Sequence, residues 1–343
     1  MNMFWHLARI VTSVVLIAFA VLSPSNVWAQ SCGTWLSGPS SSDLPAGSTV
    51  EKFAASGGNL YALVVDEAGV RSVYRLLGGE WSQLPLDPSL GVPELLAAEG
   101  GVPTVLTSKV ISETGEPPDR IYEYAVRTFD GDQWNQVATT EMFVGRRDVK
   151  EFSDMVHFNG SWYVASRYLD NDVSFVHGRG ILYRAHDGAL TSFASTQSDT
   201  CFADVDPCDL IPFPSFNDLQ VVGNSLYVGG RFNFIRFDGA TFVSASNLAR
   251  ISGESIIPMP TSPDGPVTGM FLESTSSSNP GLVVWGNFTQ IGGVTHNRIA
   301  RWNTFTSTWS TLGSGLAQVP VKVVQITGQT FNDIDYVAVG VSQ

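Results

Sequence analysis

The chain has 343 residues, a net charge of −13 and a charged fraction of only 15%. An acidic chain of low charge density offers no basic stripe for nucleic acid or for an anionic membrane surface, so both are excluded as partners. Past the N-terminal region, no apolar run is long enough for a membrane-spanning helix. We therefore expect an exported or soluble domain without a membrane span.

The N-terminus has the pattern of a secretory signal peptide. Arg9 precedes an apolar run of 13 residues from Ile10 to Leu22, and small residues follow a Ser-Pro break. This pattern predicts cleavage between Ala29 and Gln30. We expect residues 1–29 to be the signal peptide and residues 30–343 to form one domain, located outside the cell, in the periplasm or at the cell envelope.

Pairs of hairpin signals recur along the rest of the chain. The first signal is a two-residue turn before a short apolar strand, at Gly57-Gly58, Asn159-Gly160 and Gly223-Asn224. Such residues tolerate the positive φ of tight hairpins. The second signal is an arginine followed by a turn and an aromatic residue, as in "RLLGGEW" from Arg75 to Trp81. Two hairpins in series predict a four-stranded antiparallel unit.

The second signal repeats at intervals of 52, 57, 52 and 65 residues, with its arginines at Arg75, Arg127, Arg184, Arg236 and Arg301. Repeats on this scale with four strands each are typical of β-propeller blades. The predicted fold class is all-β, a propeller of four-stranded antiparallel blades. The visible units span about 50–84, 93–137, 152–193, 217–245 and 267–312, and a sixth hairpin follows at 321–341.

Residues 32–38 resemble the outer strand at 307–315 and could complete the sixth blade. The N- and C-terminal segments would then close the ring, which removes open sheet edges. We expect six blades, with seven as the alternative. The five arginines are expected to anchor neighbouring blades through backbone carbonyls. The aromatic residues of the units are expected to pack adjacent sheets together: Trp81, Trp134, Phe242, Trp302 and Trp309.

The segment "GNFTQIGGVTHNRIARWNTFTSTWSTLGSGL" (286–316) carries a family resemblance. It resembles the repeat of bacterial secreted propellers and of the fungal cortical polarity-marker family, whose units are similar to kelch-type and galactose-oxidase-like blades. The resemblance is partial over 217–245 and faint elsewhere. It implies a closed propeller and a secreted or envelope location, and it implies no particular chemistry.

In such a meander, the longer connections all lie on one face, at 108–120, 138–151, 169–180, 194–216 and 246–266. Long loops on a rigid scaffold commonly carry binding residues. The candidate binding residues on this face are Arg146, Arg147, Asp170, Asp172, His177 and Arg179. The arginines suit a carboxylate or sulfate group. The expected partner is a protein or a glycan at the cell surface.

The stretch "CFADVDPC" suggests a disulfide and an oxygen-rich loop. Cys201 and Cys208 are close in sequence, and an oxidising compartment favours their pairing. Asp204, Asp206 and Asp209 offer oxygen ligands of the kind that calcium prefers, although a solvated acidic loop has the same composition. No other cofactor is expected.

Enzyme signatures are missing from the sequence. It contains no GxSxG nucleophile elbow and no HExxH zinc helix. The leading interpretation is therefore a non-catalytic binding propeller. The alternative is a propeller hydrolase or lyase with a metal ion in the central channel, since propeller enzymes draw single residues from several blades.

Overall fold

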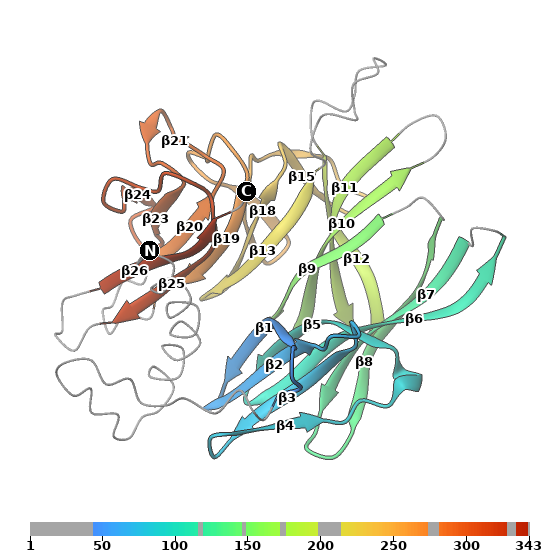
Figure 1. Ribbon diagram of the computed structural model, residues 1–343. Coiled ribbons are helices and arrows are strands. Elements are labelled where there is room, and N and C mark those ends of the chain that lie inside the picture. The colour runs from blue at the N-terminus through green and yellow to red at the C-terminus, as the bar shows by residue number, and fades with distance from the viewer. Residues whose placement is uncertain are drawn as a thin grey trace.

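The computed structural model describes residues 44–115, 119–145, 149–171, 176–197, 214–273, 281–327 and 334–341. These residues form strands and turns, with one short 3₁₀ helix, η2 (Pro88–Leu90). The expected all-β class is confirmed (Figure 1). Across the same ranges, no helix has the length and hydropathy that crossing a membrane would require.

The first three units are four-stranded antiparallel meanders at the expected places. Each opens and closes with a hairpin, and the first turn of the third unit uses positive φ at Asn159 and Gly160. Their strands are β1 (Thr49–Ser56), β2 (Asn59–Val65), β3 (Arg71–Leu77) and β4 (Glu80–Leu84); β5 (Val92–Glu99), β6 (Val102–Thr114), β7 (Asp119–Phe129) and β8 (Trp134–Val144); β9 (Val149–Phe158), β10 (Ser161–Asn171), β11 (Val176–His186) and β12 (Gly188–Gln197).

The fourth unit differs from the expected range of 217–245. Its strands are β13 (Ser215–Val222), β14 (Ser225–Arg231), β17 (Leu248–Ser252) and β18 (Ser255–Pro258). The arginine on its third strand is therefore Arg250 and not Arg236. Arg236 lies on β15 (Phe234–Phe237), which pairs with β12 of the third unit and with β16 (Val243–Ser244). The Asp-Gly hairpin at 238–239 thus extends the neighbouring sheet.

The fifth unit again matches its expected range. It consists of β19 (Val267–Leu272), β20 (Gly281–Gly286), β23 (Ile299–Asn303) and β24 (Thr308–Thr311), with a small hairpin of β21 (Gln290–Ile291) and β22 (Val294–Thr295) inserted. The sixth hairpin is β25 (Pro320–Thr327) with β26 (Ile334–Val341). The predicted closing strand at 32–38 lies outside the described residues, so ring closure and the blade count stay predictions.

A β-bulge recurs near the start of the first strand in all five units. The register with the second strand shifts by one residue each time. The residue after the bulge is Lys52, Leu95, Asp154, Asp218 and Gly269 in turn. Because a bulge bends its strand and increases its twist, equal bulges give the five sheets the same curvature.

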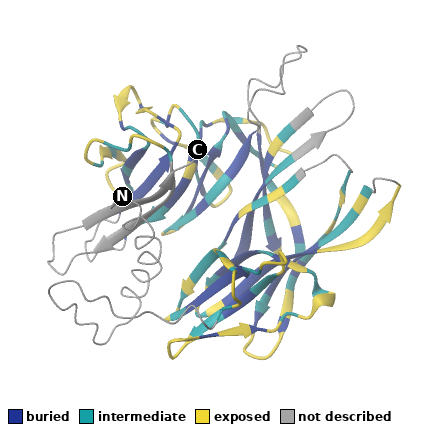
Figure 2. Cartoon of the chain, viewed as in Figure 1, coloured by how far each residue is buried: buried dark blue, intermediate teal, exposed yellow. Residues whose placement is uncertain are grey.

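The first strands meet one another in chain order. β1 contacts β5, β5 contacts β9, β9 contacts β13, β13 contacts β19, and β19 contacts β25. Separate apolar clusters fill the spaces between consecutive sheets. Figure 2 shows the buried residues along the central parts of the strands. Burial between neighbouring faces is thus the main stabilising contribution to the stack of sheets.

The expected long loops of the second and third units are instead extended strands. Residues 108–114 and 119 onward continue β6 and β7, and the connections at 138–151 and 169–180 are largely taken up by β8 to β11. These strands project beyond the other sheets as two arms (Figure 1). The outer ends of β6, β7 and β8 form one arm, and the outer ends of β10 and β11 form the other. Alternating and β-branched residues such as Val110 and Ile111 explain the extension. The range 246–266 likewise holds β17 and β18 and is not a loop.

Four of the five predicted arginines lie on third strands, opposite a second-strand residue: Arg75, Arg127, Arg184 and Arg301. Their described hydrogen bonds go to side chains of the same unit. Arg127 Nε donates to Thr107 Oγ1 at 3.2 Å, and Arg301 Nε donates to Glu273 Oε2 at 2.8 Å. Hydrogen bonds from these arginines to backbone carbonyls of neighbouring blades stay a prediction.

Tryptophans do connect adjacent units, as expected. Trp134 Nε1 donates to Pro85 O at 3.0 Å, at the end of the first unit. Trp302 Nε1 contacts Tyr227 Oη of the fourth unit at 3.3 Å. Phe242 does not take this role, since it lies beside Arg236 on the β15–β16 hairpin.

Candidate functional site

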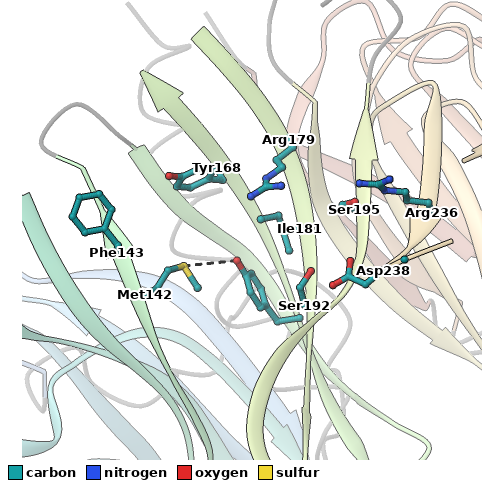
Figure 3. Close-up of a pocket in the computed structure, with 11 residues that line it drawn as sticks. Met142, Phe143, Tyr168, Arg179, Ile181, Ser192, Ser195, Arg236 and Asp238 are labelled. Atoms are coloured by element: carbon teal, nitrogen blue, oxygen red, sulfur yellow. Dashed lines mark hydrogen bonds between the residues drawn. The ribbon is translucent and has the colours of Figure 1, made fainter. Parts of the chain in front are cut away.

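A cavity of about 550 Å³ lies where the two arms face each other. It opens between β8 of the second unit, β10 to β12 of the third, and the β15–β16 hairpin (Figure 3). Two pairings bring these elements together. The start of β12 pairs in parallel with β8, and its end pairs with β15. The cavity is therefore built from three segments that are distant in sequence.

The register of the third unit places three functional side chains in one row. Lys150 on β9 is opposite Tyr168 on β10, which is opposite Arg179 on β11. Residues opposite one another in a sheet project to the same face. Ile181 and Tyr183 follow Arg179 on that face, because alternate residues of a strand point the same way. All but Lys150 line the cavity itself.

Two arginines supply positive charge to the cavity. Arg179 is exposed, and its guanidinium lies 5.7 Å from the centre of the Tyr168 ring. Arg236 lies opposite Ser195 on β12, and its guanidinium is 4.4 Å from the Phe242 ring. Among the residues that the structure describes, neither arginine forms an ion pair, and Nε of Arg236 is buried without a hydrogen-bond partner.

The remaining walls are aromatic and hydroxylic. Phe143 stands at the rim, 59% exposed, and Met142 lies next to it with its sulfur toward the cavity (Figure 3). Ser192 and Ser195 offer hydroxyl groups, and Asp238 contributes one carboxylate. Cavities that combine apolar walls with a few convergent polar groups are typical of ligand sites.

Lys150 is half-buried at the edge of this cavity among aromatic rings. Its amine donates to Tyr183 Oη at 2.6 Å and touches the Met142 sulfur. The amine lies 4.3 Å from the ring centre of Tyr183 and 5.3 Å from those of Tyr124 and Phe152. Burial and, to a smaller extent, the charge of Arg179 together lower the pKa of Lys150 to about 7.

The tyrosines around Lys150 stay protonated at neutral pH. Burial raises the pKa of both Tyr124 and Tyr183 above that of a free phenol. Tyr183 also contacts the Met142 sulfur at 3.8 Å. The hydroxyl of Tyr183 can therefore accept a hydrogen bond from the amine and donate one to a ligand oxygen.

Of the six predicted binding residues, the structure places one in the cavity, Arg179. Asp170 and His177 are register partners on β10 and β11, farther out along the same arm, and their side chains are not described. Arg146, Arg147 and Asp172 lie outside the described residues. Arg236 was expected to be a structural residue of its blade, and it instead lines the cavity, because its hairpin joins the third unit.

The predicted disulfide and metal residues are not described. Cys201, Cys208, Asp204, Asp206 and Asp209 lie outside the described ranges, as do Ala29 and Gln30. Within those ranges, no group of three or more His, Cys, Asp or Glu side chains is arranged to hold a metal ion. The carboxylates near the first strands are already bound: Asp154 pairs with Lys52, and Asp218 accepts from the Met270 N–H.

Comparison with known proteins assigns no family. No family model matches the chain, and no curated protein matches it either. Among solved structures, it resembles a puromycin-hydrolyzing peptidase of Mycobacterium tuberculosis with 12% sequence identity and a TM-score of 0.27, over 84% of this chain and 56% of that one. The chain thus spans little more than half of that peptidase, and a similarity this low supports no statement about fold or activity.

Proposed function

We propose that this chain is a secreted or cell-envelope binding protein, without catalytic activity in this role, whose partner is an acidic glycan that enters the cavity between the arms. The observation that carries the proposal is the pair Arg179 and Arg236. Both face one cavity of an acidic chain, and neither is paired with a carboxylate among the described residues. Unpaired guanidinium groups bind carboxylates or sulfates through charge-assisted hydrogen bonds.

The walls of the cavity suit a sugar. Phe143 and Tyr168 offer aromatic surface for the apolar face of a pyranose ring, and Ser192 and Ser195 offer hydrogen bonds to its hydroxyl groups. A volume of about 550 Å³ has room for a short oligosaccharide segment. A protein partner with an acidic loop shares the carboxylate chemistry, and the test below separates it from a glycan.

The export and propeller parts of the proposal have their own support. The leader at 1–29 has the signal-peptide pattern, and the segment 286–316 resembles secreted propellers. Small apolar clusters also lie on the outer faces of the end units, around Trp81 in the first and around Trp285 in the fifth. A sixth blade of β25, β26 and residues 32–38 would lie between those two faces. A variant with Trp35→Cys, Tyr336→Cys and Cys32→Ser tests this closure. A disulfide bond between positions 35 and 336 is expected if the two segments share one blade.

Titration calorimetry with tetragalacturonate tests the ligand class. We expect binding that weakens at high salt and is abolished when the carboxylates are methyl-esterified, since the ester keeps the sugar rings and removes the charge. Arg179→Gln and Arg236→Gln should each weaken binding about tenfold. Arg120→Gln is the matched control, because Arg120 is half-exposed on the other arm and already paired with Glu113 at 2.8 Å. Equal binding of acid and ester would overturn the proposal, and binding of an acidic peptide alone would assign a protein partner.

A further inference from the structure

Lys150 is a half-buried lysine without a carboxylate partner among the described residues. The groups that face its amine come from four strands: Tyr124 of β7, Met142 of β8, Tyr168 of β10, and Arg179 and Tyr183 of β11. None of these groups carries a negative charge at neutral pH, and Arg179 carries a positive one. Such surroundings disfavour an ammonium ion and favour the neutral amine.

The lowered pKa greatly increases the fraction of Lys150 side chains that are neutral amines at neutral pH. With a pKa of about 7, about half of the Lys150 side chains are neutral amines at neutral pH. An exposed lysine is neutral in only about one molecule in 10³ under the same conditions. Only the neutral form has the lone pair that attacks a carbonyl carbon, and amines activated in this way form covalent intermediates in enzymes.

The position of Lys150 gives that amine access to a ligand. Met142 and Tyr183 both touch the amine and both line the cavity, so the nitrogen lies one side chain below the cavity wall. Met142 is an unbranched side chain that can change rotamer at small cost. Arg179 lies on the same sheet face as Lys150, two strands away, with Tyr168 between them.

We propose that Lys150 forms an imine with the carbonyl group of a small anionic aldehyde or 2-oxo acid bound in this cavity. The amine adds to the carbonyl carbon and passes one proton to the carbonyl oxygen. The resulting hydroxyl then leaves as water with the second nitrogen proton, so that R–NH₂ and O=CR′R″ give R–N=CR′R″ and H₂O. Tyr183 Oη, 2.6 Å from the amine, donates a hydrogen bond to the departing hydroxyl. Arg179 and Arg236 bind the carboxylate, and this part alone rests on the proposed function.

Reductive trapping tests the amine directly on the unmodified protein. The chain has four lysines, Lys52, Lys109, Lys150 and Lys322, so peptide mapping resolves each one. The protein is treated at pH 7 with formaldehyde and cyanoborohydride, which reduces each imine to a stable amine. We expect Lys150 to be modified at least about tenfold faster than the exposed Lys109, because of its larger neutral fraction. Modification of Lys150 at or below the rate of Lys109 would overturn the proposal.

A second probe separates this inference from the anion site. Glyoxylate carries a carboxylate beside its aldehyde and formaldehyde does not. We expect Arg236→Gln to slow glyoxylate trapping at Lys150 about tenfold and to leave formaldehyde trapping nearly unchanged. Arg179→Gln should slow both reactions, and glyoxylate trapping more strongly, because loss of the Arg179 charge also raises the pKa of Lys150. Equal effects on both probes would refute the role of the arginines while the amine chemistry stands. Glyoxylate that binds in calorimetry but leaves no adduct at Lys150 after reduction would refute the amine chemistry, while the anion site would stand.

Discussion

Two lysines on equivalent first strands have opposite surroundings. Lys52 of β1 pairs with Asp154 of β9, and that carboxylate also accepts the Leu219 N–H at 3.0 Å. Lys150, four residues before Asp154 on the same β9, has aromatic rings, a thioether and the Arg179 charge around its amine, and no carboxylate among the described residues. A charged group with a full set of partners stabilises one arrangement of strands. A titratable group buried without an opposite charge is instead typical of sites that do chemistry.

The partnered region connects units in series. Asp154 of the third unit accepts from Leu219 of the fourth, and Asp218 of the fourth accepts from Met270 of the fifth. Both carboxylates follow the recurring bulge, so they occupy the same place in successive sheets. Gly269 takes this place in the fifth unit, where Trp285 fills the space that a side chain would need. We call these contacts between successive first strands, at Asp154, Asp218 and Gly269, the axis, and the axis is therefore a structural element.

The largest effect is expected at the axis. Asp154→Ala leaves the Lys52 ammonium and the Leu219 N–H without their acceptor, and we expect it to lower the free energy of unfolding by about 3 kcal/mol. Glu151→Ala on the same strand removes a more exposed ion pair with Arg167 and should cost less than about 1 kcal/mol. Urea denaturation measures both. Equal losses would mean that the axis carboxylate has no special structural role.

The same carboxylate should give the wild type an acid-sensitive step. Burial raises the pKa of Asp154, but the Lys52 charge and its hydrogen bonds outweigh burial, and the net result is a lowered pKa. A depressed folded-state pKa contributes stability at pH values above the unfolded-state value. That contribution is lost as the pH falls through the folded-state pKa. The stability difference between wild type and Asp154→Ala should therefore shrink below about pH 4 in denaturation curves.

Lys150→Met should act in the opposite direction and stabilise the protein. The folded-state pKa of about 7 lies below the ordinary value of 10.5. The folded chain thus carries the full cost of a buried charge below pH 7, and the cost declines as the pH rises from about 7 to 10.5. We expect a gain of about 2 kcal/mol at pH 6 and a smaller gain at pH 9. The exposed Lys109→Met is the control, and a loss of stability at pH 6 would contradict the prediction.

Much of the axis region was predictable from sequence, because its signals are local. Turn residues such as Asn159-Gly160 fix the hairpins, and the strand alternation fixes which faces are buried. Local signals also explain why the expected range of the fourth unit is wrong. The Asp-Gly turn after Arg236 specifies a hairpin, but it does not specify which sheet that hairpin joins. "LARISGES" at 248–255 offered an equally good arginine and turn, Arg250 and Gly253.

The cavity was only partly predictable. Arg179 was a candidate because it lies in the expected long loop at 169–180. Lys150 has no sequence signal, since its pKa depends on rings that come from β7 and β11. Arg236 gained its place through the pairing of β15 with β12, about 40 residues away. Residues whose properties arise from long-range packing leave no local sequence pattern. Residues that recur in each repeat unit do leave such a pattern.

The smallest effect on stability is expected at the rim of the arms, at Phe143. This ring is 59% exposed, so Phe143→Ser should change the free energy of unfolding by less than about 0.5 kcal/mol. The same change should weaken tetragalacturonate binding by about threefold to tenfold, because a stacking surface is lost. Phe305→Ser, at an 83% exposed turn of the fifth unit, is the control with no expected effect on binding. If Phe143→Ser and Phe305→Ser bind tetragalacturonate with equal affinity, the ligand does not contact Phe143. The difference between a structural axis and a ligand-binding rim would then not hold at this residue.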